Sequence, residues 1–160
     1  MKERTAPLVF HMSEKRIGAA SIVLNQTTLW ITGGDNSDLA SNYASNSSEF
    51  LTLSGTMPGP ELPLALYAHC MVAINNTFSI VVGGLKFDDY VSGLTFFYHH
   101  QEQKWINGSN LLEGRMRHAA GIVNDTVTKE TFVVVTGGNQ YGKFMSSTEI
   151  FFDNQWNPGK

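Results

Sequence analysis

The chain has 160 residues, of which 42% are hydrophobic and 16% charged, so it is long and apolar enough for one domain with a core and is not a disordered polypeptide. Its formal net charge of −3 gives no reason to expect a surface for nucleic acid or anionic membranes. No apolar run approaches the roughly 18 residues of a membrane span. The single cysteine, Cys70, excludes an internal disulfide framework, and we expect it to be a small buried hydrophobe.

The first residues, Met1 to Pro7, are not followed by the roughly 7–15-residue apolar core of a secretory signal. Taken as it stands, the sequence therefore predicts a cytoplasmic protein. An extracellular location is the alternative if the chain is a piece of a longer protein.

Short segments rich in Val, Ile, Phe and Thr, separated by turn residues, predict an all-β fold. In chain order we expect strands at 17–24, 28–33, 47–53 and 55–58, then at 68–74, 77–82, 93–99 and 103–107, and finally at 118–123, 131–136, 147–152 and 155–157. Four antiparallel strands in each stretch of about 50 residues form one small sheet, whose two faces must be covered by neighbouring sheets.

Three of these segments end in a glycine pair, at Gly33-Gly34, Gly83-Gly84 and Gly137-Gly138. The first glycines of the pairs lie 50 and 54 residues apart, so the sequence repeats itself at a nearly constant period. Glycine at a strand end permits positive φ and a close approach of another backbone. A dinucleotide site is excluded because the sequence has no Gly-x-Gly-x-x-Gly and no amphipathic helix after any pair.

Other features recur in phase with the glycine pairs. Ser47-Ser48-Glu49 matches Ser147-Thr148-Glu149, and the second repeat lacks the glutamate. Trp105 and Trp156 follow in two repeats, while the first repeat has Thr56 at that place. Two arginines, Arg16 and Arg117, open the first and third repeats. We expect Arg16, Arg115 and Arg117 to brace neighbouring sheets, with contact to an acidic partner as the alternative.

This set of motifs resembles the kelch family of β-propellers, from about Lys15 to Pro158. The resemblance implies a partial kelch-type propeller of about three four-stranded antiparallel blades. Repeat 1 spans 15–63, repeat 2 spans 64–113 and repeat 3 spans 114–160, with 1–14 as the remnant of a preceding blade. Closed propellers have about four to eight blades. We therefore expect a piece of a larger propeller, with a six-bladed ring of two chains or an open three-blade module as alternatives, and possible self-association through exposed blade faces.

In such a blade the loops between the second and third strands (the b–c loops) and the connections between blades (d–a) share one face. The b–c loops are 35–46, 85–91 and 139–145. Their aromatic and charged residues suit protein recognition, although the rings could instead pack onto blade edges. The candidate partner-binding residues are Tyr43, Phe87, Asp88, Asp89, Tyr90, Tyr141, Lys143 and Phe144. We expect a non-catalytic scaffold that presents its b–c and d–a loops to a protein partner, with no cofactor and no metal. It would be a substrate receptor for a ubiquitin ligase if BTB or F-box regions exist elsewhere.

A second hypothesis is a secreted or extracellular glycosylated propeller that binds carbohydrate or matrix. It rests on five Asn-x-Ser/Thr sequons, at Asn25, Asn46, Asn75, Asn107 and Asn124. Three of them fall in hairpins between the first and second strands (the a–b hairpins), where asparagine and threonine are also simply favoured turn residues.

A third hypothesis, a fragment of a galactose oxidase-like enzyme, follows only from the resemblance between kelch repeats and the propeller of that copper enzyme. No copper-ligand spacing is identifiable. His69 and His118 occupy equivalent repeat positions, which favours a structural role. His99 and His100 are adjacent on a predicted strand, so their side chains point to opposite faces and cannot chelate together.

Overall fold

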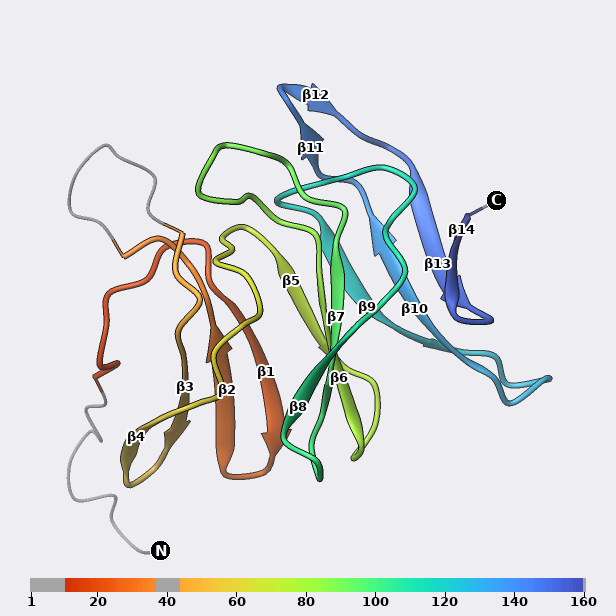
Figure 1. The fold of residues 1–160 in the computed structure, drawn as a ribbon. Helices are drawn as coiled ribbons and strands as arrows, with labels where there is room; N and C mark the ends of the chain where they lie inside the picture. The colour runs from red at the N-terminus through yellow and green to blue at the C-terminus, as the bar shows by residue number, and fades with distance from the viewer. Residues whose placement is uncertain (1–10, 37–43, 160) are drawn as a thin grey trace, which may run out of the picture.

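The computed structural model describes residues 11–36 and 44–159, and it confirms the all-β class (Figure 1). The described strands form three four-stranded antiparallel sheets and a two-stranded ribbon. Sheet 1 contains β1 (Ala20–Asn25), β2 (Thr28–Thr32), β3 (Ser48–Thr52) and β4 (Gly55–Pro58); sheet 2 contains β5 (Cys70–Ala73), β6 (Phe78–Val82), β7 (Thr95–His99) and β8 (Lys104–Asn107); sheet 3 contains β9 (Ala119–Asn124), β10 (Thr131–Thr136), β13 (Thr148–Phe152) and β14 (Gln155–Pro158). The ribbon contains β11 (Asn139–Gln140) and β12 (Lys143–Phe144).

Each predicted repeat contains one of the three sheets, and the twelve expected strands are all present. Within a sheet, strands that follow one another in the chain are hydrogen-bonded neighbours, and the β11–β12 ribbon is inserted between β10 and β13. The register is the same in all three sheets, since Thr32 pairs with Ser48, Val82 with Thr95, and Thr136 with Thr148. This shared register makes residues of the three sheets directly comparable.

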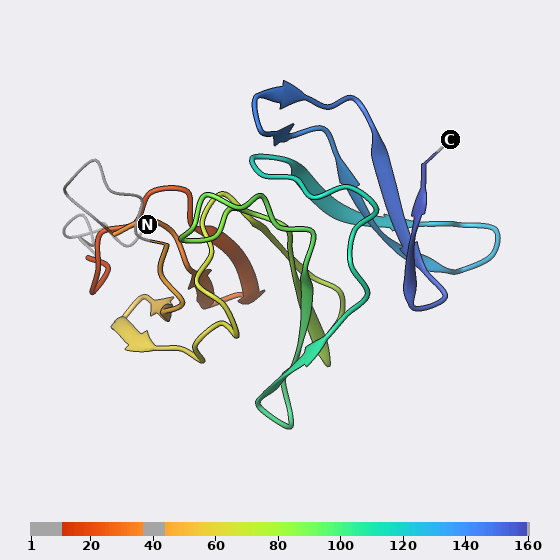
Figure 2. The same ribbon diagram turned by 45° about the horizontal axis from the view of Figure 1, so that its top comes forward.

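The three sheets follow one another side by side, with the first strands β1, β5 and β9 in contact (Figure 2). Trp30 of sheet 1 is fully buried against sheet 2, with ring centroids 4.9 Å from Tyr98 and 5.8 Å from Trp105. A second apolar layer joins sheets 2 and 3 and includes Ile80 and Trp156. Each sheet thus covers one face of its neighbour, as four-stranded units of this size require.

The first two glycine pairs lie where a strand ends against the next sheet, as the sequence predicts. Gly83 has φ 63°, and a Cβ atom there would lie 2.6 Å from the carbonyl oxygen of Arg115 and 2.9 Å from Cε1 of His118. Gly137 has the same left-handed φ of 66°, but its nearest neighbour would be the Met145 carbonyl oxygen at 3.6 Å, because no described sheet lies against sheet 3 on that side. Gly83 therefore needs both the conformation and the space of glycine.

Main-chain hydrogen bonds also join the sheets. The N–H groups of Gly34 and Gly84 donate to the carbonyl oxygens of Leu66 (2.9 Å) and Arg115 (2.8 Å), which belong to the segments entering the next sheets. A further row runs across all three sheets: Ala68 donates to Gly18, and Arg117 donates to Ala68, at 2.7 and 2.9 Å. All three residues of this row have φ between 53° and 65°.

The expectation that Arg117 matches Arg16 is wrong. Arg117 instead occupies the position of Gly18 and Ala68 in this row of hydrogen bonds, and it is exposed. The equivalent of Arg16 is Arg115. The Arg16 guanidinium donates to Gly33 O (2.8 Å) and to Glu49 Oε1 (3.0 Å), both within sheet 1.

Arg115 repeats this pattern in sheet 3, where it donates to Gly137 O (2.9 Å), Ser147 O (3.0 Å) and Glu149 Oε1 (2.7 Å). Its own main chain is bonded to sheet 2, with its N–H donating to Ser92 O at 3.2 Å. The predicted bracing role therefore holds for Arg115, which links two sheets.

Sheet 2 replaces this polar network by apolar residues. The shared register places Leu66 where the other sheets have Arg16 and Arg115, and Phe96 where they have Glu49 and Glu149. Both belong to the buried core between sheets 1 and 2. The missing glutamate of the second repeat is thus accompanied by the loss of its arginine, so no unpaired buried charge remains there.

Residues 11–16 run beside sheet 1, where Ser13 donates from its N–H and its hydroxyl to Glu49 Oε2 at 2.8 and 3.0 Å. The rest of the predicted blade remnant, 1–10, lies outside the described residues. The described part of the chain contains no helix with the length and apolar character needed to cross a membrane.

Candidate interaction surface

The b–c loops of sheets 2 and 3 emerge at the same end of the molecule, at the top of Figure 1. The loop of sheet 2 is closed at its base by a bridge between Leu85 and Val91. Within it Lys86 N donates to Tyr90 O (3.0 Å), and Asp89, with φ 58°, donates to Lys86 O (3.1 Å). These bonds hold the loop in a compact turn.

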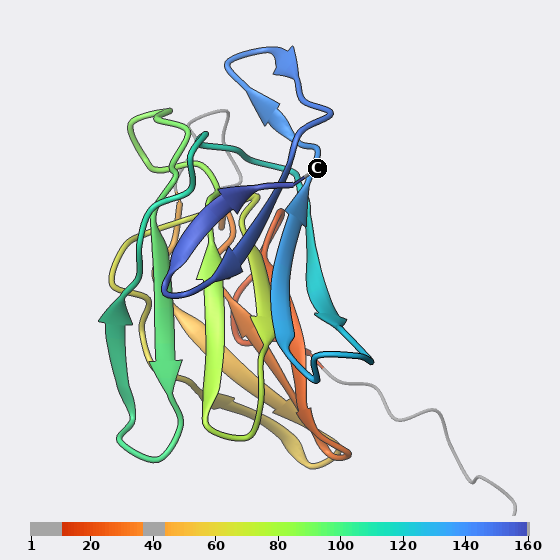
Figure 3. The same ribbon diagram turned by 90° about the vertical axis from the view of Figure 1, so that its right-hand side faces the viewer.

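The b–c loop of sheet 3 is the β11–β12 hairpin, which projects beyond the ends of the long strands (Figure 3). Its two central residues, Tyr141 and Gly142, have φ of 49° and 85°. Positive φ at both central positions is the geometry of a type I′ turn, which matches the twist of the flanking strands. Asn139 Oδ1 accepts a hydrogen bond from Gly142 N at 2.9 Å and fixes the turn further.

Aromatic rings from these two loops gather on this surface. The Tyr90 and Tyr141 rings meet edge to face, with centroids 6.4 Å apart. The Lys86 ammonium lies 4.8 Å from the centroid of Tyr90, a cation–π distance, and 3.5 Å from Asp88 Oδ2. The two loops are therefore joined through side chains that belong to different sheets.

The rings are exposed rather than packed onto sheet edges. Relative exposure is 60% for Phe87, 55% for Tyr90, 63% for Tyr141 and 88% for Phe144. We call these four residues the aromatic loop patch. The charged candidates Asp88, Asp89 and Lys143 are exposed around them, while Tyr43 lies outside the described residues.

The chain has no match among known protein families and none among curated proteins.

The two repeat-equivalent histidines lie at the junctions between sheets. His69 Nε2 is 3.0 Å from Thr32 Oγ1, and His118 packs against Gly83. Burial lowers the pKa of His69 to about 3, with a further contribution from His118. Burial lowers the pKa of His118 to about 4, and the charge of Arg115 adds to this effect. Both rings are neutral packing groups near pH 7.

Cys70 is on β5, and its thiol donates to the His118 carbonyl oxygen at 2.9 Å. Burial raises the pKa of this thiol to about 11, which keeps it protonated and unreactive at neutral pH. Across 11–36 and 44–159, no three His, Cys, Asp or Glu side chains come close enough together to hold a metal ion.

All five sequon asparagines are exposed. Asn25, Asn75 and Asn124 lie in or beside the a–b hairpins, at the end opposite the aromatic loop patch. In the first two hairpins the asparagine Oδ1 accepts from the main chain two residues on, at Thr27 N (2.9 Å) and Thr77 N (2.8 Å). These side chains therefore also stabilise their turns.

Proposed function

We propose that the chain is a partial kelch-type β-propeller that acts as a non-catalytic protein-binding scaffold through its b–c loops. The observation that carries this proposal is the aromatic loop patch. Its four exposed rings come from two loops that are fixed by hydrogen bonds and in contact with each other.

The arrangement of the sheets supports the propeller part of the proposal. Three antiparallel four-stranded sheets follow one another, each with a glycine pair at the end of its second strand. Side-by-side sheets with their first strands in contact are what consecutive blades would look like. The buried Arg115–Glu149 pair and the inter-sheet main-chain hydrogen bonds would hold the loops of neighbouring blades at a fixed spacing.

The chemistry of the aromatic loop patch supports protein recognition. Tyrosine and phenylalanine bury a large area on binding with few rotatable bonds, and such rings are enriched at the centres of interfaces. Charged residues surround them: Lys86 and Lys143 are interspersed with Asp88 and Asp89. An apolar centre with a mixed polar rim fits a folded or extended protein partner better than a nucleic acid or a small anion.

Photo-crosslinking tests this proposal. p-Benzoyl-phenylalanine is introduced at Phe144 in the patch and, as a control, at Val127, which is 86% exposed in the β9–β10 hairpin at the opposite end. We expect a protein that crosslinks at Phe144 and not at Val127 in cells that produce the protein naturally. Proteins that crosslink equally at both positions, or only at Val127, would contradict the proposal.

The exposed sequons favour a second candidate, an extracellular propeller that binds carbohydrate or matrix. All five asparagines are accessible, as glycan attachment requires. Expression through a secretory host followed by peptide-N-glycosidase treatment tests this candidate. A mobility shift that disappears in the Asn25→Gln, Asn75→Gln, Asn124→Gln variant would support it, and an unshifted protein would remove its main support.

A further inference from the structure

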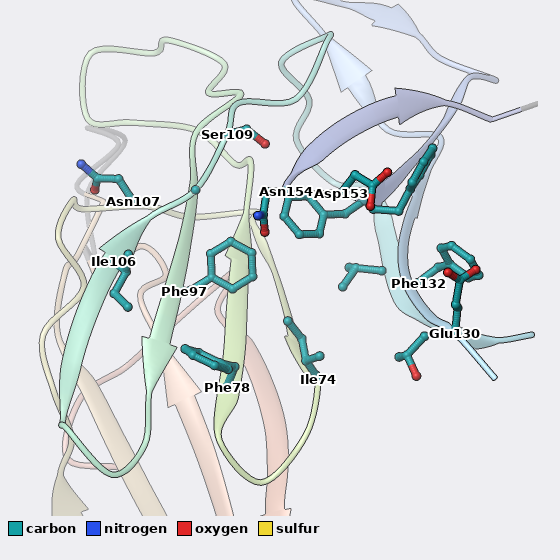
Figure 4. A pocket seen from close by; sticks show the side chains of 15 residues that line it. Ile74, Phe78, Phe97, Ile106, Asn107, Ser109, Glu130, Phe132, Asp153 and Asn154 are labelled. Carbon is teal, nitrogen blue, oxygen red and sulfur yellow. The ribbon is translucent and has the colours of Figure 1, made fainter. Parts of the chain in front are cut away.

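A groove of about 1050 Å³ lies between sheets 2 and 3 (Figure 4). Residues from the β5–β6 hairpin, from β6, β7 and β8 and from the segment after β8 line one side of it, and residues from β10, β13 and the turn after β13 line the other. Five phenylalanines take part in the lining: Phe78, Phe97, Phe132, Phe151 and Phe152.

Comparison with the junction between sheets 1 and 2 explains why the groove exists. There, Trp30 fills the layer between the sheets and contacts Phe50, Tyr98 and Trp105. The register places Ile80 of sheet 2 where sheet 1 has Trp30. The smaller side chain cannot reach the facing sheet as an indole does, so the outer part of the second junction stays open.

A second difference enlarges the opening and changes its charge. In sheet 2, the residue after β7 is His100, whose ring lies against Trp30 and whose Nε2 is 3.0 Å from Ser79 Oγ. In sheet 3, the residue after β13 is Asp153, which is exposed and lines the groove. An aromatic group that closes the first junction is thus replaced by a carboxylate at the mouth of the second.

The phenylalanine rings form two separate clusters. Phe97 lies between two partners, with ring centroids 6.4 Å from Phe78 and 5.3 Å from Phe151. Phe132 and Phe152 meet edge to face at 6.3 Å on the other side. The apolar surface that these rings form accommodates an aryl or alkyl group of several carbon atoms.

The charged groups that line the groove are all negative. They are Glu130 and Asp153, both exposed, and no Lys, Arg or His is among the lining residues. Lys129 precedes Glu130 in the chain but does not line the groove. The hydroxyl oxygen of Ser109, which also lines it, is buried without a hydrogen-bond partner in the described structure. The groove therefore combines apolar walls, two carboxylates and an unsatisfied hydroxyl.

We propose that this groove binds a small organic cation with an aryl or alkyl body. The body packs on the phenylalanines, and the ammonium lies beside Glu130 and Asp153, where ring faces add cation–π attraction. An anion of the same shape is rejected by the two carboxylates. This site is separate from the aromatic loop patch and does not depend on the function proposed for it.

Three probes with one scaffold test the charge preference: 4-phenylbutylamine, 4-phenylbutanol and 4-phenylbutyrate, titrated into the whole chain by ligand-observed NMR at millimolar concentrations. We expect the amine to bind best, the alcohol several-fold more weakly, and the acid most weakly. Binding of the acid as tight as that of the amine, or no binding of any probe, would overturn the proposal.

Two kinds of variant locate the site. Neutralisation of both carboxylates, Glu130→Gln with Asp153→Asn, is expected to remove the preference for the amine over the alcohol, whereas the exposed control Glu61→Gln leaves it unchanged. Ile80→Trp, which copies the first junction, is expected to weaken all three probes about tenfold. If that variant does not fold, as judged by circular dichroism, the charge variants decide alone. Retention of the amine preference after both carboxylates are neutralised would refute the site.

Discussion

Arg115 and Glu149 form a buried ion pair, with Nη2 and Oε1 2.7 Å apart, and they join sheets 2 and 3 because the main chain of Arg115 is hydrogen-bonded to sheet 2. The side chains are 0% and 3% exposed. The equivalent pair in sheet 1 joins Arg16 and Glu49 at 3.0 Å. Burial raises the pKa of Glu49, but hydrogen bonds from Ser13 and Arg16 outweigh it and lower that pKa overall.

Removal of one member of this pair leaves the other as an unpaired buried charge. We expect Arg115→Met to lower the free energy of unfolding by about 3–5 kcal/mol. The double variant Arg115→Leu, Glu149→Phe copies the apolar pair of sheet 2 and is expected to recover at least half of that loss. Urea unfolding followed by circular dichroism measures both. A loss below about 1 kcal/mol in the single variant would show that the pair does not brace the sheets.

Gly83 and Gly137 form a matched pair for testing the contact between sheets. Their φ angles differ by little, at 63° and 66°, so alanine introduces similar backbone strain of about 1–2 kcal/mol at each. Only at Gly83 does the new Cβ also meet Arg115 O and His118. We expect Gly83→Ala to be more destabilising than Gly137→Ala by at least about 1 kcal/mol in the same urea assay. Equal losses would mean that sheets 2 and 3 are not packed as described.

The buried histidines make stability depend on pH. The pKa values of His69 and His118 in the folded chain, about 3 and about 4, lie below the ordinary histidine value of 6.5, so the unfolded chain binds more protons between these limits. Their contribution to stability is complete above pH 6.5 and is lost as the pH falls toward these folded-state values. We expect the free energy of unfolding to fall by up to about 1.4 kcal/mol per pH unit for each histidine below pH 6.5.

The comparison variant for this effect is His69→Ala with His118→Ala, because Ala19 holds the same place in sheet 1. Stability measured between pH 5 and 6.5, above the range in which carboxylates titrate, should then vary much less with pH. An unchanged slope in the variant would assign the pH dependence to other groups.

The glycine pairs and the strand positions were accessible from sequence because they depend on local requirements: glycine for positive φ, and alternating apolar residues for strands. The equivalence of Arg115 and Arg16 was not accessible from sequence. Arg16 lies 17 residues before Gly33, but Arg115 lies 22 residues before Gly137, since the β9–β10 hairpin is longer. Arg115 and Arg117 lie only two residues apart in the same segment, and only the hydrogen bonds identify Arg115 as the equivalent of Arg16.

The candidate surface could be predicted in part. Loop positions and their aromatic residues follow from strand alternation, but the contact between Tyr90 and Tyr141 depends on the type I′ turn that directs Tyr141 toward the neighbouring loop. The inter-sheet groove could not be predicted, because it results from the alignment of Ile80 with Trp30, which requires the register.

The proposed function requires that the aromatic loop patch binds a protein. The most direct measurement is the affinity of the crosslinked partner, once purified, for the wild-type chain, for Tyr90→Ala with Tyr141→Ala, and for Val127→Ala, by isothermal titration calorimetry. We predict at least a tenfold weaker affinity for the double variant, which is about 1.4 kcal/mol, and an unchanged affinity for Val127→Ala. Unchanged affinity in the double variant, with all three proteins folded, would contradict the claim.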